Sequence, residues 1–227
     1  MKKNITILSA LTLLTCSLTF TSCKKDDITP PVVTMTGGDQ TISLGGNFTD
    51  PGATANDNKD GALSVSTTGS VNQNNTGVYQ ITYSATDAAG NTGTAVRNVT
   101  VVNDLEAMTG TYVSTLNPGS YTYTQTITAS STFNRRIVFG AFGDYHYYSG
   151  GVKTGALNTI YADVNNTGAS SPISLTSQTA IQVGVNPTDR TFSGTGSRVS
   201  ASTFNLSYTE ATPAPSTAAF TEVYVKQ

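Results

Sequence analysis

The chain has 227 residues, which is enough for one large domain or two small ones. Charged residues make up 11% of the chain and tryptophan is absent. Thr, Ser, Gly and Asn are abundant and hydrophobic residues make up 37%, so disorder is an alternative to a packed fold. The formal charge is −2, and no basic stripe is available to neutralise phosphates, which argues against nucleic-acid binding. The apolar residues nevertheless fall into short alternating runs, and this pattern indicates a folded, β-rich chain.

Residues 1–22 have the features of a secretory signal peptide. Lys2 and Lys3 form a short positive start, and the apolar run 5–14 that follows is too short for a membrane-spanning helix. The alternative is an amphipathic first helix of the domain, but the run has no polar face. We therefore expect cleavage directly before Cys23.

Cys23 has three conceivable roles: a disulfide partner, a free thiol or a lipid attachment site. The other cysteine, Cys16, would leave with the signal, and a lone exposed thiol is a liability in an oxidising compartment. Residues 21–23, Thr-Ser-Cys, resemble the lipobox of bacterial lipoproteins, although Phe20 replaces the usual aliphatic residue. The resemblance implies fatty acyl chains such as palmitate on Cys23, and hence a membrane anchor.

Residues 24–27, Lys-Lys-Asp-Asp, resemble the short charged signal that sends Bacteroidota lipoproteins to the exterior of the outer membrane. The alternative is a plain solvated linker. We interpret residues 23–30 as a lipid-anchored tether, which ends where Pro30 and Pro31 stiffen the backbone. The expected location is the outer membrane, facing the cell exterior.

Residues 31–103 read as a series of short strands separated by turn residues. Tyr79, Ile81 and Tyr83 alternate with polar residues, so one face of that strand is apolar. Such short strands with frequent turns predict a β-sandwich.

Three segments of this domain carry a resemblance to a known family. They are Asp-Pro-Gly-Ala at 50–53, Gly-Val-Tyr at 77–79, and Ala-Thr-Asp-Ala-Ala-Gly-Asn at 85–91. Together they resemble the bacterial immunoglobulin-like (Ig-like) domain first described in a pesticidal crystal protein. The resemblance implies an Ig-like β-sandwich with Tyr79 at a tyrosine corner, where its hydroxyl bonds backbone upstream.

Residues 56–61, Asn-Asp-Asn-Lys-Asp-Gly, are dense in oxygen donors. The calcium-loop pattern nevertheless fails, because Thr67 stands where the bidentate glutamate is needed. Acidic side chains from separate loops could still converge on calcium, and the alternative is that they bond their own backbone in turns. The candidate metal ligands are Asp50, Asp57, Asp60 and Asp87.

Residues 104–227 predict a second antiparallel β-domain. Tyr121, Tyr123 and Ile127 share one face of a nearly strict alternation, and about eight such strands follow one another. An up-and-down order of this kind allows either a closed barrel or a sandwich. The beginning and end of this region resemble the C-terminal β-domain that follows Ig-like modules in Bacteroidota lipoproteins, a domain to which the resemblance attaches no activity. The whole chain is thus expected to be all-β.

The sequence offers no catalytic constellation, so we do not expect an enzyme. His146 is the only histidine, and its spacing from acidic and nucleophilic residues selects neither a zinc site nor a triad. An aromatic and polar patch is the candidate ligand site, because tyrosine can stack on sugar rings and also form hydrogen bonds. Its residues are Tyr145, His146, Tyr147, Tyr148 and Arg136. The alternative is cross-strand pairing that only stabilises a hairpin.

The expected function is a non-catalytic surface lipoprotein that binds a glycan or another extracellular ligand. A structural, adhesin-like protein that binds another protein is the alternative, with a hydrolase third. No cofactor is expected apart from calcium, and the sequence predicts no oligomeric state.

Overall fold

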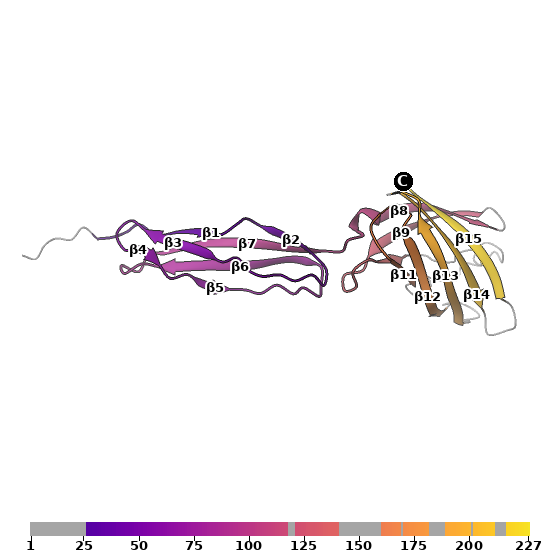
Figure 1. Ribbon diagram of the computed structural model, residues 1–227, viewed down its shortest axis with the longest axis horizontal. Helices are drawn as coiled ribbons and strands as arrows, with labels where there is room; N and C mark the ends of the chain where they lie inside the picture. The colour runs from indigo at the N-terminus through magenta and orange to yellow at the C-terminus, as the bar shows by residue number, and fades with distance from the viewer. Residues whose placement is uncertain are drawn as a thin grey trace, which may run out of the picture.

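The computed structural model describes residues 26–117, 121–140, 160–168, 170–181, 189–200, 202–211 and 217–227. Two β-domains lie end to end in an elongated molecule, and the described chain begins at the end of the N-terminal domain farthest from the second domain (Figure 1). The all-β fold class predicted from the sequence is confirmed. Among the residues described, no helix has the length and apolar character needed to cross a membrane.

The N-terminal domain is a sandwich of two sheets. One sheet has the order β1-β3-β4 and the other β2-β7-β6-β5, in which β2 runs parallel to β7. The strands are β1 (Val32–Met35), β2 (Gln40–Ser43), β3 (Ala53–Asp57), β4 (Gly61–Leu63), β5 (Ser66–Thr68), β6 (Gly77–Thr86) and β7 (Thr92–Val102).

The core of this sandwich follows from the alternation of apolar and polar residues along its strands. Ile81 and Tyr83 on β6 and Val99 on β7 are buried, and partly buried apolar residues from both sheets pack against them. This apolar core is small, and a charged side chain completes it.

Arg97 on β7 is the bulkiest fully buried side chain of the described chain. Its Nε donates a hydrogen bond to the Tyr83 hydroxyl at 2.9 Å and lies 3.5 Å from Oδ1 of Asp50. The other guanidinium nitrogens donate to backbone carbonyls, namely those of Thr36 at 2.9 Å, Gly52 at 3.0 Å and Gly38 at 3.3 Å. Arg97 therefore connects both sheets. Its guanidinium N–H donors are paired with acceptors, as the burial of a charged arginine requires.

The predicted tyrosine corner is confirmed. The Tyr79 hydroxyl donates to the carbonyl oxygen of Asn75 at 2.9 Å, four residues upstream. The bond fixes the loop that leads into β6, at the end of the sandwich that faces the second domain.

The second domain is a closed antiparallel barrel, so the barrel alternative is the one found. Consecutive strands pair from β8 to β15, and β15 pairs with β8 to close the cylinder. The 3₁₀ turn η1 (Glu106–Met108) leads into it. The strands are β8 (Gly110–Asn117), β9 (Tyr121–Ala129), β10 (Arg136–Phe139), β11 (Ile160–Val164), β12 (Pro172–Ile181), β13 (Asp189–Arg198), β14 (Thr203–Ala211) and β15 (Thr217–Lys226).

Side chains fill the barrel interior, as expected for a cylinder of eight strands. The rings of Phe204 and Tyr224 stack at 4.4 Å, while Tyr112 meets Phe204 edge-on at 5.5 Å. Small residues allow the strands to approach closely: a Cβ on Gly194 would lie only 2.2 Å from a carbonyl oxygen of β14.

Asn103 joins the two domains. Its side chain is buried, donates to the carbonyls of Ser130 and Phe133, and accepts from the amides of Leu105 and Arg135, all at 2.8–3.0 Å. A backbone hydrogen bond from Thr76 to Ser131 adds a contact between the domains. With its donors and acceptors paired, Asn103 holds the connection in one conformation.

Candidate functional site

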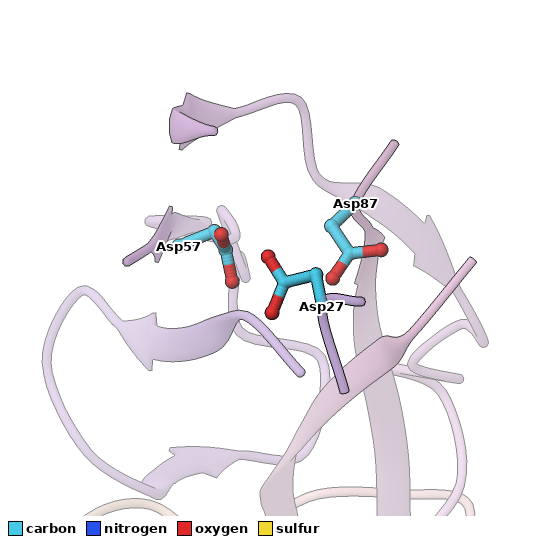
Figure 2. Close-up of side chains that lie close together, drawn as sticks. All are labelled: Asp27, Asp57 and Asp87. Carbon is cyan, nitrogen blue, oxygen red and sulfur yellow. The ribbon is translucent and has the colours of Figure 1, made fainter. Parts of the chain in front are cut away.

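Three aspartates converge at the tip of the N-terminal domain, opposite the barrel (Figure 2). Asp57 ends β3, Asp87 follows β6, and Asp27 belongs to the segment that precedes β1. One carboxylate oxygen from each of the three lies within 4.8 Å of the others. Carboxylate oxygens are ligands of hard cations, so this arrangement is a candidate metal centre.

The strand pattern explains why two of these aspartates point inward. On β3 the side chains of Ala55 and Asp57 are buried and alternate with exposed neighbours. On β6 the buried series of Ile81, Tyr83 and Ala85 continues in step to Asp87, which is 6% exposed. Both aspartates therefore occupy positions at which the alternation predicts an apolar residue.

Asp57 is 3% exposed, and its two oxygens differ in their surroundings. Oδ1 accepts hydrogen bonds from the backbone amides of Lys59 at 2.7 Å and Asp60 at 3.0 Å, whereas Oδ2 has no hydrogen-bond partner. The amides of Asp60 and Lys59 lower the pKa of Asp57, although the nearby Asp87 carboxylate acts in the opposite direction. Asp57 is thus ionised at neutral pH with one buried oxygen unpaired.

Asp87 is held by Asn91. Burial raises the pKa of Asp87, but hydrogen bonds from the side chain and the backbone of Asn91 outweigh burial and leave the pKa lowered. The two bonds measure 2.7 Å from Nδ2 and 2.8 Å from the backbone amide. Asp87 is therefore a second fixed negative charge at the tip.

Asp27 comes from the segment that the sequence interpretation assigned to an export signal. Its Oδ2 lies 3.7 Å from Nζ of Lys59, and its backbone carbonyl accepts a hydrogen bond from Nδ2 of Asn91 at 3.0 Å. The segment thus lies against the loops after β3 and β6. Sequence reasoning missed Asp27 as a site residue, because no periodicity connects it with Asp57 or Asp87.

Of the four predicted metal ligands, the structure brings Asp57 and Asp87 together. Asp60 lies beside them, but its Oδ2 accepts the backbone amide of Ala88 at 2.7 Å and so links the two loops. Asp50 lies elsewhere: it accepts a hydrogen bond from the Tyr83 hydroxyl and pairs with the buried Arg97.

Arg136, one residue of the predicted ligand patch, is engaged within the barrel wall. It forms a two-point ion pair with Asp163 on β11, with distances of 2.7 and 2.9 Å. The guanidinium also lies 4.3 Å from the ring centre of Phe133 and 3.8 Å from that of Tyr161. The hydrogen bonds to Asp163 raise the pKa of Arg136. The other patch residues, Tyr145, His146, Tyr147 and Tyr148, and the lipid site Cys23 lie outside the described residues.

The barrel has a shallow open pocket of about 500 Å³ across β13, β14, β15 and β8. Exposed and partly exposed positions of these strands supply hydroxyl groups to it, and Asn117 supplies an amide. The hydroxyl-bearing residues are Ser193, Thr195, Ser207, Thr209 and Thr221. Hydroxyls both donate and accept hydrogen bonds, and Tyr208, Ala219 and Phe220 add apolar surface, so the pocket suits a ligand that has both polar and apolar faces.

Inside the barrel, the buried carboxylate of Glu222 accepts hydrogen bonds from three tyrosine hydroxyls. Tyr123 bonds Oε1, while Tyr224 at 2.6 Å and Tyr208 at 3.4 Å bond Oε2. Burial raises the pKa of Glu222, and the tyrosine hydrogen bonds oppose this only in part. This network was not predicted, since an inward-facing glutamate on β15 looks like any strand residue in the sequence.

Comparison with known protein families supports the Ig-like interpretation. Residues 33–101 match the bacterial surface protein, Ig-like domain. This match covers β1 to β7 apart from the first residue of β1 and the last of β7, and we refer to the N-terminal domain as the Ig-like domain from here on. Because this domain family occurs in bacterial surface proteins, the match supports the assignment of the chain as a surface protein. No curated protein shows significant similarity to the chain.

Several solved structures resemble the chain at low identity. A lipoprotein from Bacteroides thetaiotaomicron is 21% identical, with a TM-score of 0.33, and the match covers 87% of this chain and 100% of that one. A predicted outer membrane protein from Bacteroides fragilis is 18% identical, with a TM-score of 0.33, over 77% of this chain and 72% of that one. A Clostridium perfringens protein that contains a carbohydrate-binding module with GlcNAc is 20% identical, with a TM-score of 0.27, over 50% of this chain and 30% of that one.

Proposed function

We propose that the chain is an outward-facing lipoprotein of the outer membrane, and that its barrel is a non-catalytic binding module for extracellular glycans. The observation that carries this proposal is the end-to-end arrangement, in which the segment next to Cys23 and the barrel occupy opposite ends of the molecule (Figure 1). With the anchor at one end, the Ig-like domain would act as a spacer, and its length would separate the barrel from the membrane.

Lipidation of Cys23 would supply the anchor. Each buried CH₂ group of an acyl chain contributes about 0.8 kcal/mol, so more than one chain holds a domain of this size firmly at a membrane. Anchoring raises the effective concentration of captured ligand at the cell surface, which lets a weak binding site retain its ligand.

The hydroxyl-lined pocket supports a glycan as the ligand. Sugars present many hydroxyls, and the side chains of Ser207, Thr195 and Thr221 can exchange hydrogen bonds with them. The pocket opens on the outer face of the barrel, where a polysaccharide chain can lie along the strands.

The anchor and the ligand are tested separately. Mass spectrometry of the purified envelope protein should show acylated Cys23, and added protease should remove the barrel from intact cells. An unmodified thiol, or full protection from protease, would reject the outward-facing lipoprotein.

For the ligand, the full chain is applied to a glycan array. Ser207→Tyr, which fills the pocket, should abolish retention, whereas Thr124→Tyr places the same side chain on the exposed face of β9 and should leave retention unchanged. An equal loss of retention in both variants, or no retention of the wild-type protein on the array, would reject the pocket as a glycan-binding site. The adhesin-like alternative would then remain.

A further inference from the structure

We propose that Asp27, Asp57 and Asp87 bind one calcium ion, and that this ion fastens the segment preceding β1 to the tip of the Ig-like domain. Ion binding does not depend on what the barrel binds. Only its consequence at the membrane rests on the proposed lipid at Cys23.

The unpaired oxygen of Asp57 is the first support. Asp57 is only 3% exposed, yet its Oδ2 receives no hydrogen bond. A buried carboxylate oxygen without a partner is unfavourable, and such an atom calls for a cation or another donor. The alternation along β3 directs this side chain inward, while Asn56 at the preceding position is exposed.

The geometry of the three carboxylates is the second support. Oxygens bound to the same calcium ion lie about 2.3–2.6 Å from it, and hence up to about 4.6–5.2 Å from one another. The oxygens of the three aspartates lie within 4.8 Å of one another, so they can bind one calcium ion with little movement. Zinc prefers nitrogen and sulfur ligands, and magnesium requires a shorter, stricter octahedron, so calcium fits this all-oxygen set best.

The charge balance at the tip also favours a cation. Three carboxylates converge there, and the ammonium group of Lys59 approaches one of them, Asp27, at 3.7 Å. The Lys59 side chain is 45% exposed, so it can turn toward water when an ion enters. Water molecules would complete the six to eight ligands that calcium takes.

The ion would connect three segments that are distant in the sequence. Asp57 ends β3 and Asp87 follows β6, and the loops after these two strands are already joined by the hydrogen bond from Ala88 to Asp60. Asp27 lies only four residues after Cys23. Calcium would therefore lock the last part of the tether onto the domain. With a lipid on Cys23, calcium would then leave fewer movable residues between the membrane and the Ig-like domain.

The experiment is calorimetric titration of the full chain, purified in detergent, with calcium chloride. We expect saturable binding of one ion with Kd about 10⁻⁴–10⁻³ M, as for other extracellular modules. Two variants test the site. Asp57→Asn keeps an acceptor for the amides of Lys59 and Asp60. Asp27 lies outside the strands of the sandwich, so the domain should fold normally in Asp27→Asn. Each should weaken binding about tenfold or more, since each removes a charged ligand.

Asp39→Asn is the matched control. It removes one negative charge from the same domain, at a site where Asp39 accepts hydrogen bonds from Asn98. Its affinity should stay within about twofold of the wild type, since only screened long-range charge effects remain. Absence of saturable heat up to about 10 mM calcium, well above the expected Kd, or equal affinity in Asp27→Asn, overturns the site.

Hydrogen exchange tests the fastening. Amides of residues 27–29 should exchange more slowly with calcium in the wild type and at an unchanged rate in Asp27→Asn. Calcium binding without slower exchange in this segment would overturn the role in fastening.

Discussion

Replacement of Arg97 by leucine should destabilise the Ig-like domain severely. The substitution keeps apolar volume but removes the donors to the Tyr83 hydroxyl and to three backbone carbonyls, and it leaves Asp50 without its cation. Removal of one partner from a buried ion pair costs about 3–5 kcal/mol. The lower part of that range applies, since the Asp50 side chain is 26% exposed and water can solvate it.

That loss is large relative to the whole domain. At about 0.05–0.15 kcal/mol per residue, a domain of the size of residues 33–101 has a free energy of unfolding of about 3–10 kcal/mol. Arg97→Leu should therefore remove between a third and all of it. Arg97→Lys keeps the charge but not the planar set of donors, and should fall between leucine and wild type.

The measurement must separate the two domains, because they can unfold independently. Hydrogen exchange of β6 and β7 peptides in the full chain reports the Ig-like domain, and peptides from β14 and β15 report the barrel. Arg135→Gln is the control: the Arg135 side chain is 49% exposed and pairs with Asp104, so its loss should cost about 0–1 kcal/mol. A loss below about 1 kcal/mol in Arg97→Leu would refute the view that this arginine completes the core.

Three further substitutions test other parts of the fold. Tyr79→Phe removes the hydrogen bond to Asn75 and should lower the free energy of unfolding of the Ig-like domain by about 0.5–1.5 kcal/mol, measured by urea unfolding. An unchanged urea midpoint would show that this hydrogen bond does not stabilise the domain. Asn103→Ala leaves buried partners unpaired and should cost about 1–3 kcal/mol, with a wider spread of domain orientations in small-angle scattering; an unaltered scattering curve would contradict this. Burial raises the pKa of Glu222 above its unfolded value, so barrel stability should fall as pH rises from the unfolded pKa through the folded one. Glu222→Gln should remove that slope, and a slope that persists would assign it to other groups.

Much of the fold could be predicted from local pattern. The alternation of Tyr79, Ile81 and Tyr83 with polar residues gives β6 its inward face, and the same period places Asp87 inward. The turn-rich segments shared with the Ig-like family identify the first domain, while its assignment to the pesticidal-crystal-protein type stays a prediction. The second domain was predicted as an antiparallel barrel or sandwich, and the sequence left this choice open, because closure depends on the pairing of β8 with β15 at opposite ends of the domain.

The candidate site divides in the same way. Asp57 and Asp87 were predicted as ligands from their oxygen-rich loops, and the pattern of their strands makes both point inward. Asp27 could not be predicted, since its place depends on how the segment before β1 folds back over two loops. Asp50 carries an equally suitable carboxylate, but it accepts a hydrogen bond from Tyr83 and lies beside Arg97.

The sequence by itself determined which residues form strands and which way their side chains point, because these properties follow from the two-residue period and from local turn chemistry. Its resemblance to a known family identified the first domain as Ig-like. Only the tertiary structure decided which acidic residues meet, which arginine is buried, and that the second domain closes on itself. Each of these depends on contacts between segments far apart in the chain, and no local pattern encodes the partner.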